Sequence, residues 1–326
     1  MSASHAATFT EDFSTNPLQK GWQVFGDTNL FVWNQANQNL EVTWDSTHPN
    51  SYFYRPLNAT LTRYDDFTLE FDLHLNDIAS GVEPGKTGPL QIGFGLLNLA
   101  GATSTNFMRG AYGGAPDVAE FDYYTYGYYE DSGVIYPSPA STVPSFLPGT
   151  DPHHYAPVFV SVFETELPTN QTVHIRLAYS GGDQAAVVSA TANGVPLSQL
   201  GPLVLTESGN SQFTPTDTFR VDTFSISSYS STGDPFDSVL AHGTVDNLAV
   251  TAQLLPITRL TGSANANGVW VAQFFAHSNW LYTLERTSDF KSWVPVSATL
   301  RGTEDIMTLQ DTNALPAQAF YRVRTD

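Results

Sequence analysis

The amino-acid sequence predicts an all-β fold, and three observations lead to that prediction. Short runs rich in Val, Phe, Tyr, Thr and Leu are separated by clusters of Gly, Pro, Asn and Asp, which is typical of a β-sandwich or barrel. The run FTLEFDLHL, residues 67–75, alternates apolar and polar side chains at every position, as a strand with one buried face does. In ATANGVPL, residues 190–197, an Asn-Gly pair between two such runs predicts a hairpin turn.

The predicted strands follow one another along residues 1–253. ATFTEDFST (7–15) predicts the first strand of this part and GTVDNLAVTAQL (243–254) its last. SISSYSSTGD (225–234) predicts a loop, because serine, glycine and aspartate cluster there. Five further runs between these ends have strand composition: LQIGFGLLNL (90–99), HYAPVFVSVF (154–163), TVHIRLAYS (172–180), AAVVSATANG (185–194) and TFRVDTFSIS (218–227).

The distribution of charge indicates two domains. Residues 254–326 contain six basic and six acidic side chains, so the whole net charge of −19 lies in residues 1–253. We expect a large jelly-roll β-sandwich over 1–253, a linker over 254–257 and a small β-sandwich module over 258–326. The module has the composition of five or six strands within roughly 70 residues.

Composition excludes several classes of function. Cysteine is absent, which excludes a disulfide framework, a zinc–thiolate site and a cysteine nucleophile. The strong negative charge disfavours nucleic acid and anionic membrane as partners. No apolar run is long enough to insert into a membrane. The opening MSASHAATF lacks the pattern of a signal peptide, and its Ala/Ser-rich character suits the trimmed end of a mature secreted protein.

One stretch concentrates candidate chemistry. DVAEFDYYTYGYYED, residues 117–131, holds five tyrosines, five carboxylates and no base. If the stretch is extended, alternate side chains beginning with Phe121 and Tyr123 share one face and are expected to pack in the core. The other face is then the candidate site. Cα atoms of Glu120 and Asp122 would lie roughly 6.5–7 Å apart on that face, so their carboxylates can share a cation or flank a glycosidic bond. The alternative is a solvated face of an ordinary strand. The candidate face comprises Glu120, Asp122, Tyr124, Tyr126, Tyr128 and Glu130.

The tyrosines of this region predict a sugar-contact surface. An aromatic ring stacks on the C–H groups of a sugar while its hydroxyl bonds to sugar hydroxyls. Tyrosine also favours strands for its packing alone, which is the alternative explanation. The candidate ligand-binding residues are therefore Glu120, Asp122, Tyr124, Tyr126, Tyr128 and Tyr136.

The strand resembles the E-x-D-x-E strand of laminarinase-type glycoside hydrolases in the concanavalin-like superfamily. That resemblance implies a nucleophile at Glu120, an assisting carboxylate at Asp122 and a general acid at the last Glu. Here the last position falls on Tyr124, or on Thr125 if the strand is bulged, and neither is a carboxylic acid. An enzyme would need its general acid from elsewhere, such as Glu130 or a tyrosine.

AEFDYY also resembles the VEFD-x-Y metal strand of legume lectins. The resemblance implies that Glu120, Asp122 and Asp131, which stands eleven residues after the Glu, help to bind metal. The family's asparagine and histidine ligands are replaced by Tyr126 and Tyr136. A single Ca²⁺ on carboxylate and carbonyl oxygens fits this set better than a transition metal.

A second acidic group is predicted where the first and last strands of the large domain meet. EDF…VDN is similar to the structural calcium site of jelly-roll carbohydrate-binding modules, so we expect Asp12 and Asp246 to be neighbours and candidate Ca²⁺ ligands. The alternative is that these are turn aspartates.

The C-terminal YTLERTSDFKSWVPV and LQDTNALPAQAFYRVR resemble terminal β modules of secreted proteins of verrucomicrobial type. Linkage, display or sorting is the role that this resemblance implies. The aromatic residues expected to form the module's core are Trp280, Tyr282, Trp293, Phe320 and Tyr321.

The sequence thus predicts a secreted or cell-surface, lectin-like protein. Its expected function is calcium-assisted binding of a neutral polysaccharide on a tyrosine-rich concave sheet. One alternative is a diverged glycoside hydrolase or polysaccharide lyase that uses Glu120 and Asp122, with Glu130 as a further candidate. Another is a surface or assembly protein without a small ligand.

Overall fold

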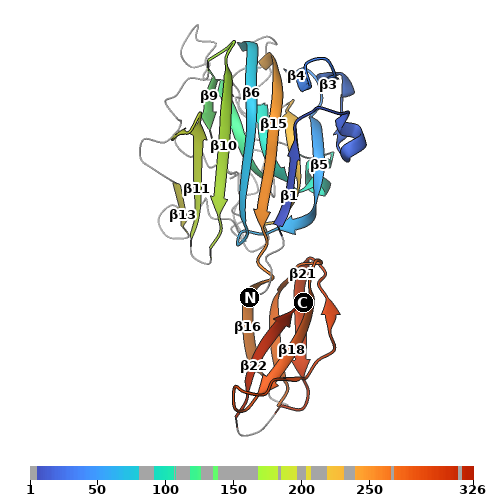
Figure 1. Ribbon diagram of the computed structural model, residues 1–326, viewed down its shortest axis with the longest axis vertical. Coiled ribbons are helices and arrows are strands. Elements are labelled where there is room, and N and C mark those ends of the chain that lie inside the picture. Colours follow the sequence, from blue (N-terminus) through green and yellow to red (C-terminus); the bar gives the residue numbers. More distant parts are fainter. Residues whose placement is uncertain are drawn as a thin grey trace. The chain divides into compact units, whose positions relative to one another are not determined.

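The computed structural model describes most of the chain, in two compact units. One unit spans residues 7–252 and the other is formed mainly by residues 253–326. Figure 1 shows the strands of both units. The residues that the structure describes are 6–80, 92–105, 107, 118–125, 135–138, 168–182, 185–196, 203–206, 219–230, 239–265, 268–314 and 318–326.

The large unit contains a nine-stranded sheet. Its main path runs β12-β11-β10-β6-β15-β4-β3, while β1 pairs with β15 and β13 with β11. The first and last strands of the unit therefore lie side by side, as the sequence predicts. The strands are β1 (Ala6–Glu11), β3 (Phe31–Asn34), β4 (Asn39–Asp45), β6 (Asp66–Ser80), β10 (Thr172–Ser180), β11 (Ala185–Ala192), β12 (Val195–Pro196), β13 (Leu203–Thr206) and β15 (Val239–Gln253).

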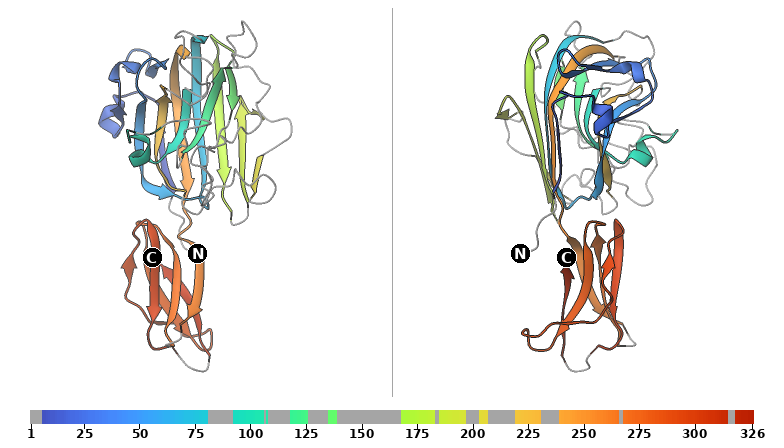
Figure 2. Two further views of the ribbon diagram at one scale, coloured as in Figure 1. Left: turned by 180° about the vertical axis from the view of Figure 1, so that it is seen from behind. Right: turned by 45° about the vertical axis from the view of Figure 1, so that its right-hand side comes forward.

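A six-stranded sheet forms the second layer, and Figure 2 shows the two layers from the side. Its order is β2-β5-β14-β7-β8-β9. Three short helices, η1 (Pro17–Lys20), η2 (Thr28–Leu30) and α1 (Leu99–Ala102), lie between strands in the sequence. The strands of this sheet are β2 (Gln23–Phe25), β5 (Ser51–Leu61), β7 (Ile92–Leu97), β8 (Val118–Thr125), β9 (Ile135–Ser138) and β14 (Val221–Ser228).

Aromatic side chains join the two layers. Phe71 of β6 stacks on Phe94 of β7 with ring centroids 4.3 Å apart, and Trp44 of β4 contacts the same Phe94 ring at 5.8 Å. Trp22 stacks on Phe53 of β5 at 4.7 Å. All five side chains are almost completely buried, which places the core between the sheets. The all-β prediction is confirmed, and the large unit is a β-sandwich.

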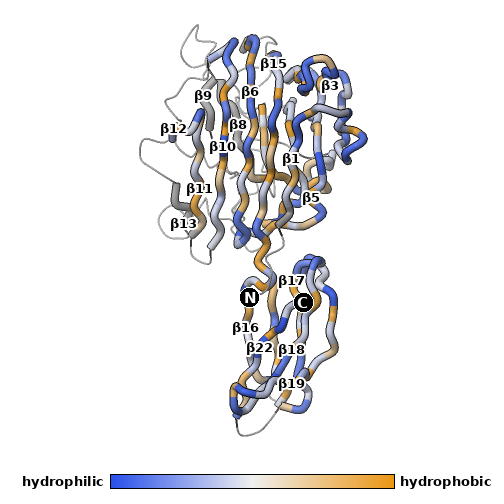
Figure 3. The backbone as a smooth tube through the Cα atoms, viewed as in Figure 1, coloured by the Kyte–Doolittle hydropathy of each residue, from blue (hydrophilic) through white to orange (hydrophobic). Residues whose placement is uncertain are grey.

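The alternation that predicts β6 is present in the structure. Phe67, Leu69, Phe71, Leu73 and Leu75 are buried, while the side chains between them are half-buried on the opposite face. Figure 3 shows apolar and polar stretches alternating along such strands.

The predicted Asn-Gly hairpin is also present, because Ala192 pairs with Val195 across a two-residue turn. Asn193 and Gly194 both have positive φ, which is the type I′ geometry. The predicted strand at 154–163 lies outside the described residues.

The small unit contains two sheets of its own. β16-β17-β21 form one, and β18 pairs with β19, β20 and β22 in the other. Phe274 of β17 and Tyr282 of β18 pack between the sheets at 5.1 Å. The strands are β16 (Ile257–Ala264), β17 (Trp270–Ala276), β18 (Leu281–Thr287), β19 (Val294–Pro295), β20 (Leu300–Arg301), β21 (Asp305–Asp311) and β22 (Phe320–Thr325).

The prediction for the core of this unit is partly wrong. Trp280 and Tyr282 are buried, as expected. Trp293, Phe320 and Tyr321 are only half-buried. The physical reason is position: Phe320 and Tyr321 belong to β22, which pairs only with β18 and so lies at a sheet edge, and Trp293 belongs to a connection.

Candidate functional site

The candidate strand β8 lies between β7 and β9 in the six-stranded sheet. Its register pairs Glu120 with Gly95 and Asp122 with Gly93. On the other side of β7, Gly95 pairs with Ser225 and Gly93 with Ser227 of β14. Carboxylate, glycine and serine positions therefore follow one another across three strands.

The neighbours of these residues settle which face of the sheet they occupy. Phe94, Phe224 and Ile226 are completely buried, and Phe94 contacts the opposite sheet. Because side chains alternate along a strand, Gly95 and Ser225 lie on the outer face, away from the sandwich core. Register pairs Glu120 with Gly95 and therefore places Glu120 on that outer face. The backbone of Phe121 pairs with Phe94, and that of Asp122 with Gly93. We call Gly93, Gly95, Glu120, Ser225 and Ser227 the outer strip.

The outer strip is polar and nevertheless buried. Glu120 is 1% exposed, and Ser225 and Ser227 are completely buried. The two serine hydroxyls are hydrogen-bonded to each other at 2.7 Å. The alternative in which Glu120 lies on a solvated strand face is therefore wrong.

Tyr229, immediately after β14, completes the arrangement. Its hydroxyl donates a hydrogen bond to a carboxylate oxygen of Glu120. The Tyr229 ring is buried against the rings of Tyr52 and Phe107, with centroids 5.7 and 6.2 Å away. Tyr229 and the two serines are functional candidates that the sequence prediction missed. All three lie in the serine cluster predicted as a loop, 225–234, and the two serines also lie in the run predicted as a strand, 218–227. β14 continues through Ser228, as the strand prediction requires.

An apolar layer lies on the same outer face. Tyr52, Leu97, Val118 and Tyr229 pack there with Ala102 of α1 and with Phe107. The Tyr52 hydroxyl donates to the Ala102 carbonyl at 3.0 Å, which fixes α1 over the sheet. The layer borders the outer strip on two sides. Leu97 and Val118 are separated from Gly95 and Glu120 by one residue each, and Tyr52 pairs with Ser227.

Gly95 is required by the close approach of β8. A Cβ atom at this position would collide with the carbonyl oxygen of Ala119 and the Cα atom of Glu120. Both obstacles are backbone, so they cannot move aside without disturbing the β7–β8 pairing. The Glu120 side chain also occupies the space over Gly95, because its Cγ atom would lie 2.8 Å from such a Cβ atom.

The other predicted residues of this site are described in part or not at all. For Asp122, Tyr124 and Tyr136 the structure describes the backbone only, and Tyr124 pairs with Tyr136 between β8 and β9. Tyr126, Tyr128, Glu130 and Asp131 lie outside the described residues. Their roles stay predictions.

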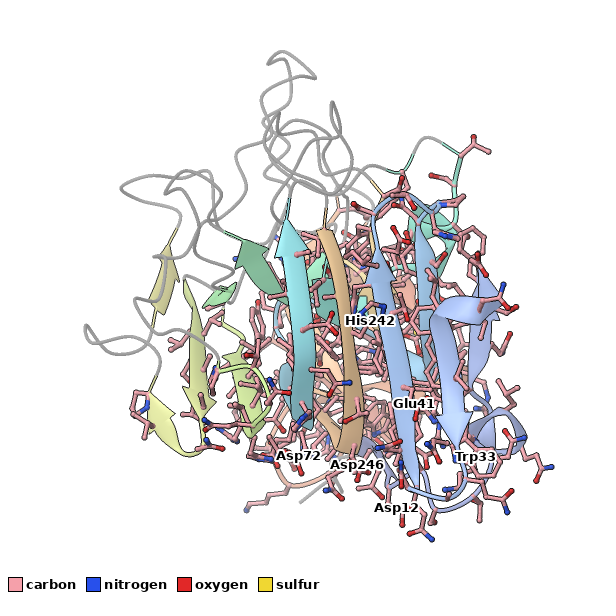
Figure 4. All side chains as sticks on the ribbon, turned by 90° about the horizontal axis from the view of Figure 1, so that it is seen from above. Asp12, Trp33, Glu41, Asp72, His242 and Asp246 are labelled. Carbon is pink, nitrogen blue, oxygen red and sulfur yellow. The ribbon has the colours of Figure 1, made fainter. Side chains whose placement is uncertain are left out.

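The acidic group predicted where the first and last strands of the large unit meet is present. Figure 4 labels its aspartates, Asp12, Asp72 and Asp246. Burial raises the pKa of Asp246, and the negative charges of Asp72 and Asp12 raise it further, so these three carboxylates are neighbours. The Lys20 ammonium lies 2.8 Å from Glu11 and 3.5 Å from Asp12. The expected proximity of Asp12 and Asp246 is confirmed.

The fit of these carboxylates to a metal is poor at this end. The Lys20 ammonium already supplies positive charge to Glu11 and Asp12. Asp72 accepts hydrogen bonds at both oxygens, from His174 at 2.7 Å and from Asn247 at 2.8 Å. Within the described ranges, no group of three or more His, Asp or Glu side chains is arranged to hold a metal ion.

The outer face of the nine-stranded sheet carries paired charges. His242 contacts Asp77 at 2.8 Å, and Arg176 contacts Glu70 at 2.8 Å. These pairs are largely exposed, and exposed ion pairs contribute little to stability or selectivity. The buried outer strip is therefore the stronger candidate site. No helix in the described part of the chain is long and apolar enough to cross a membrane.

Comparison with known proteins finds similarity only at the level of structure. No protein-family model matches the chain, and no curated protein matches its sequence. Among solved structures, peanut lectin with a 9mer peptide is 13% identical with a TM-score of 0.37, covering 77% of this chain and 100% of the lectin. Lectin II from Ulex europaeus is 13% identical with a TM-score of 0.38, covering 76% and 98%. The carbohydrate recognition domain of Emp46p, in its metal-free form, is 12% identical with a TM-score of 0.35, covering 71% and 91%. The chain is thus distantly similar in structure to legume lectins and to a lectin carbohydrate recognition domain.

Proposed function

We propose that the large unit is a lectin-like module that binds a neutral glycan over the outer strip. One observation carries this proposal: the polar side chains of Glu120, Ser225 and Ser227 are buried on the face of the sheet that does not form the sandwich core. The outer face of a sheet is ordinarily either solvated or covered by an apolar layer. The strip differs from both cases because its buried side chains are polar.

The polar groups of the strip suit a hydroxyl-rich ligand. A binding pocket usually combines a closed surface with a few fixed polar groups that orient the ligand. Here the fixed groups are the Glu120 carboxylate and the hydroxyls of Ser225 and Ser227. Glu120 is held by Tyr229, so the carboxylate does not need to reorganise when a sugar hydroxyl approaches.

The glycine next to Glu120 fixes the position of the carboxylate. The Glu120 side chain lies against the β7 backbone at Gly95, because a Cβ atom there would come within 2.8 Å of the Glu120 Cγ atom. The backbone of Asp122 pairs with Gly93, and we assign its carboxylate as the second polar contact. The segment that follows β8 contributes Tyr126 and Tyr128 in the sequence, and we assign these tyrosines to stacking on the sugar.

A neutral ligand fits the electrostatics. Residues 1–253 carry the entire net charge of −19, and the strip itself holds a buried carboxylate. An anionic sugar would be repelled both at a distance and at the site. Polysaccharides are partners that a secreted or cell-surface protein meets, and we include that location in the proposal.

The test is glycan binding by the full chain and by Glu120→Gln, measured on an array of neutral glycans and by titration. Glutamine keeps the volume of Glu120 and can still accept the Tyr229 hydrogen bond, so the fold should survive. We expect Glu120→Gln to weaken binding at least tenfold. Glu41→Gln is the matched control, because Glu41 is exposed on the other sheet and bonds only to Asn34 at 2.6 Å among the contacts described. Equal binding by wild type and Glu120→Gln would refute the assignment of this site.

A catalytic variant of the proposal has one observation in its favour. Tyr229 places a phenolic proton donor on Glu120, and a carboxylate with a hydroxyl partner is a combination that general acid–base catalysis uses. Release of reducing or unsaturated sugars by wild type, lost in Glu120→Gln and in Tyr229→Phe, would support a diverged hydrolase or lyase. Self-association without any bound glycan would instead support a surface or assembly protein.

A further inference from the structure

The small unit presents an aromatic patch of Phe290, Trp293, Phe320 and Arg322. The Phe290 ring is 60% exposed, which is the largest exposed fraction among the large apolar side chains of this unit within the described residues. Its centroid lies 3.9 Å from that of Phe320 and 6.4 Å from that of Trp293. We propose that this patch is a second carbohydrate-binding site, separate from the outer strip, for a short stretch of neutral polysaccharide.

The backbone holds Phe290 in an unfavourable conformation. Its φ is +60°, a left-handed region that bulky residues rarely adopt. The turn is fixed around it: the Thr287 hydroxyl accepts hydrogen bonds from the backbone N–H groups of Asp289 and Phe290, at 3.2 and 3.0 Å. One oxygen of Asp289 accepts the N–H groups of Lys291 and Ser292, at 2.9 and 3.0 Å. Asparagine or glycine would relieve this strain, so the position sacrifices stability to present an exposed ring.

The side chains next to Phe290 in the patch are also held in place. Arg322 lies over the Trp293 ring at 4.3 Å from its centroid. The guanidinium of Arg322 is anchored to Glu285, which is buried and also accepts from Arg324 at 3.0 Å. Phe320 pairs with Thr287 at the start of the turn, so β22 and the turn are registered to each other. An aromatic surface that is rigid before binding loses little entropy when a ligand arrives.

The size of the patch decides between a sugar and a protein. A complete Phe or Trp side chain offers about 150–250 Å² of surface. Two of the three rings are already half-buried, so the area that remains is far below the roughly 800 Å² that each partner buries in a stable protein interface. One exposed ring with a second beside it matches the apolar face of a sugar.

The charges around the patch favour a neutral ligand. Glu285 accepts from both Arg322 and Arg324, and Asp326 contacts Arg324 at 2.9 Å, so two guanidiniums face two carboxylates. Lys291 and Ser292 at the rim offer hydrogen-bond donors beside the exposed ring, as recognition of sugar hydroxyls requires.

The experiment is native electrophoresis of the full chain through gels that contain a soluble mixed-linkage β-glucan, a xylan or a galactomannan. Phe290→Asn is the principal variant, because asparagine tolerates positive φ and should leave the module at least as stable. Phe290→Ala and Ile306→Ala form a matched pair, since Ile306 is 51% exposed in the same unit but in its other sheet. Each substitution is made in wild type and in the Glu120→Gln chain, so that the two sites are measured separately.

We expect at least one polysaccharide to retard the chain, with apparent affinity lowered tenfold or more by Phe290→Asn and Phe290→Ala and unchanged by Ile306→Ala. The effect should persist in the Glu120→Gln background. Retardation that is lost in Glu120→Gln and untouched by both Phe290 variants would overturn the second site while supporting the first. Retardation by none of the gels would overturn both. A change from dimer to monomer in sedimentation of Phe290→Asn, with retardation unchanged, would identify a self-association surface and overturn the proposal.

Discussion

The Tyr229 hydroxyl donates a hydrogen bond to the Glu120 carboxylate, and both side chains are buried on the outer face of the six-stranded sheet. This contact connects the end of β14 to β8, with β7 between them. It therefore couples the aromatic cluster around Tyr52 and Phe107 to the carboxylate of the proposed glycan site.

Removing the Tyr229 hydroxyl should destabilise the large unit. Tyr229→Phe takes a donor from a buried carboxylate, and hydrogen bonds to charged groups contribute about 1.5–3 kcal/mol. Tyr52→Phe is the matched control, because its hydroxyl is equally buried but bonds to the neutral Ala102 carbonyl, where about 1 kcal/mol is expected. Urea denaturation of both variants and of Tyr229→Phe/Glu120→Gln supplies a double-mutant cycle. A Tyr229→Phe loss no larger than that of Tyr52→Phe would mean that the charged contact is unimportant.

The close approach of β8 to β7 should depend on Gly95. Gly95→Ala places a methyl group against the backbone of Ala119 and Glu120, so β8 must move away from β7. We expect a loss of more than about 2 kcal/mol in the free energy of unfolding, since a backbone clash cannot be relieved by a rotamer change. Gly194→Ala provides the comparison. That position has φ of +78° with open space around it, so only the cost of a left-handed alanine, about 1 kcal/mol, is expected. Similar losses in the two variants would show that β8 is not tightly packed.

Most of the fold follows from local pattern, as particular residues show. The alternation from Phe67 to Leu75 predicts β6 because one face of a strand is buried, and Asn193–Gly194 predicts its turn because both residues accept positive φ. The outer strip is different. Ser225 and Ser227 belong to a run that predicts a strand, 218–227, and to a serine cluster that predicts a loop, 225–234. Pairing with β7 and β5 makes them strand residues.

The burial of Glu120 also escapes sequence reasoning. A carboxylate on the outer face of a strand reads as solvated, and its partner Tyr229 is 109 residues away in the chain. Neither α1 nor Phe107 is marked in the sequence as a cover for that face. Long-range contacts of this kind are what local periodicity does not contain.

Calcium binding can be located by thermal unfolding with EDTA and with added Ca²⁺. A ligand present at 100 times its Kd stabilises the folded state by about 2.7 kcal/mol, which corresponds to a rise in Tm of several degrees. We expect this rise in Tm in wild type and in Asp246→Asn. The carboxylates near Asp246 do not need a calcium ion, because Lys20 already supplies positive charge to Glu11 and Asp12. Glu120→Gln/Asp122→Asn should lose it. A rise lost in Asp246→Asn instead would place the ion near Asp12, and no rise in wild type would refute the calcium prediction.

The small unit should lose stability in acid through Glu304. Burial raises the pKa of this carboxyl, but hydrogen bonds from His277 at 3.0 Å and from the N–H and hydroxyl of Ser278 at 2.6 and 2.7 Å outweigh it, so the pKa is lowered from 4.5. A lowered folded-state pKa gives stability that is complete above the unfolded value and is lost as pH falls through the folded value. Hydrogen exchange of β17 and β18 amides, measured between pH 5.5 and pH 3, should therefore accelerate more in wild type than in Glu304→Gln once intrinsic rates are divided out. Asp305→Asn, an exposed carboxyl at the next position, should behave as wild type. If Glu304→Gln keeps the full acid dependence, the loss of stability arises from other groups.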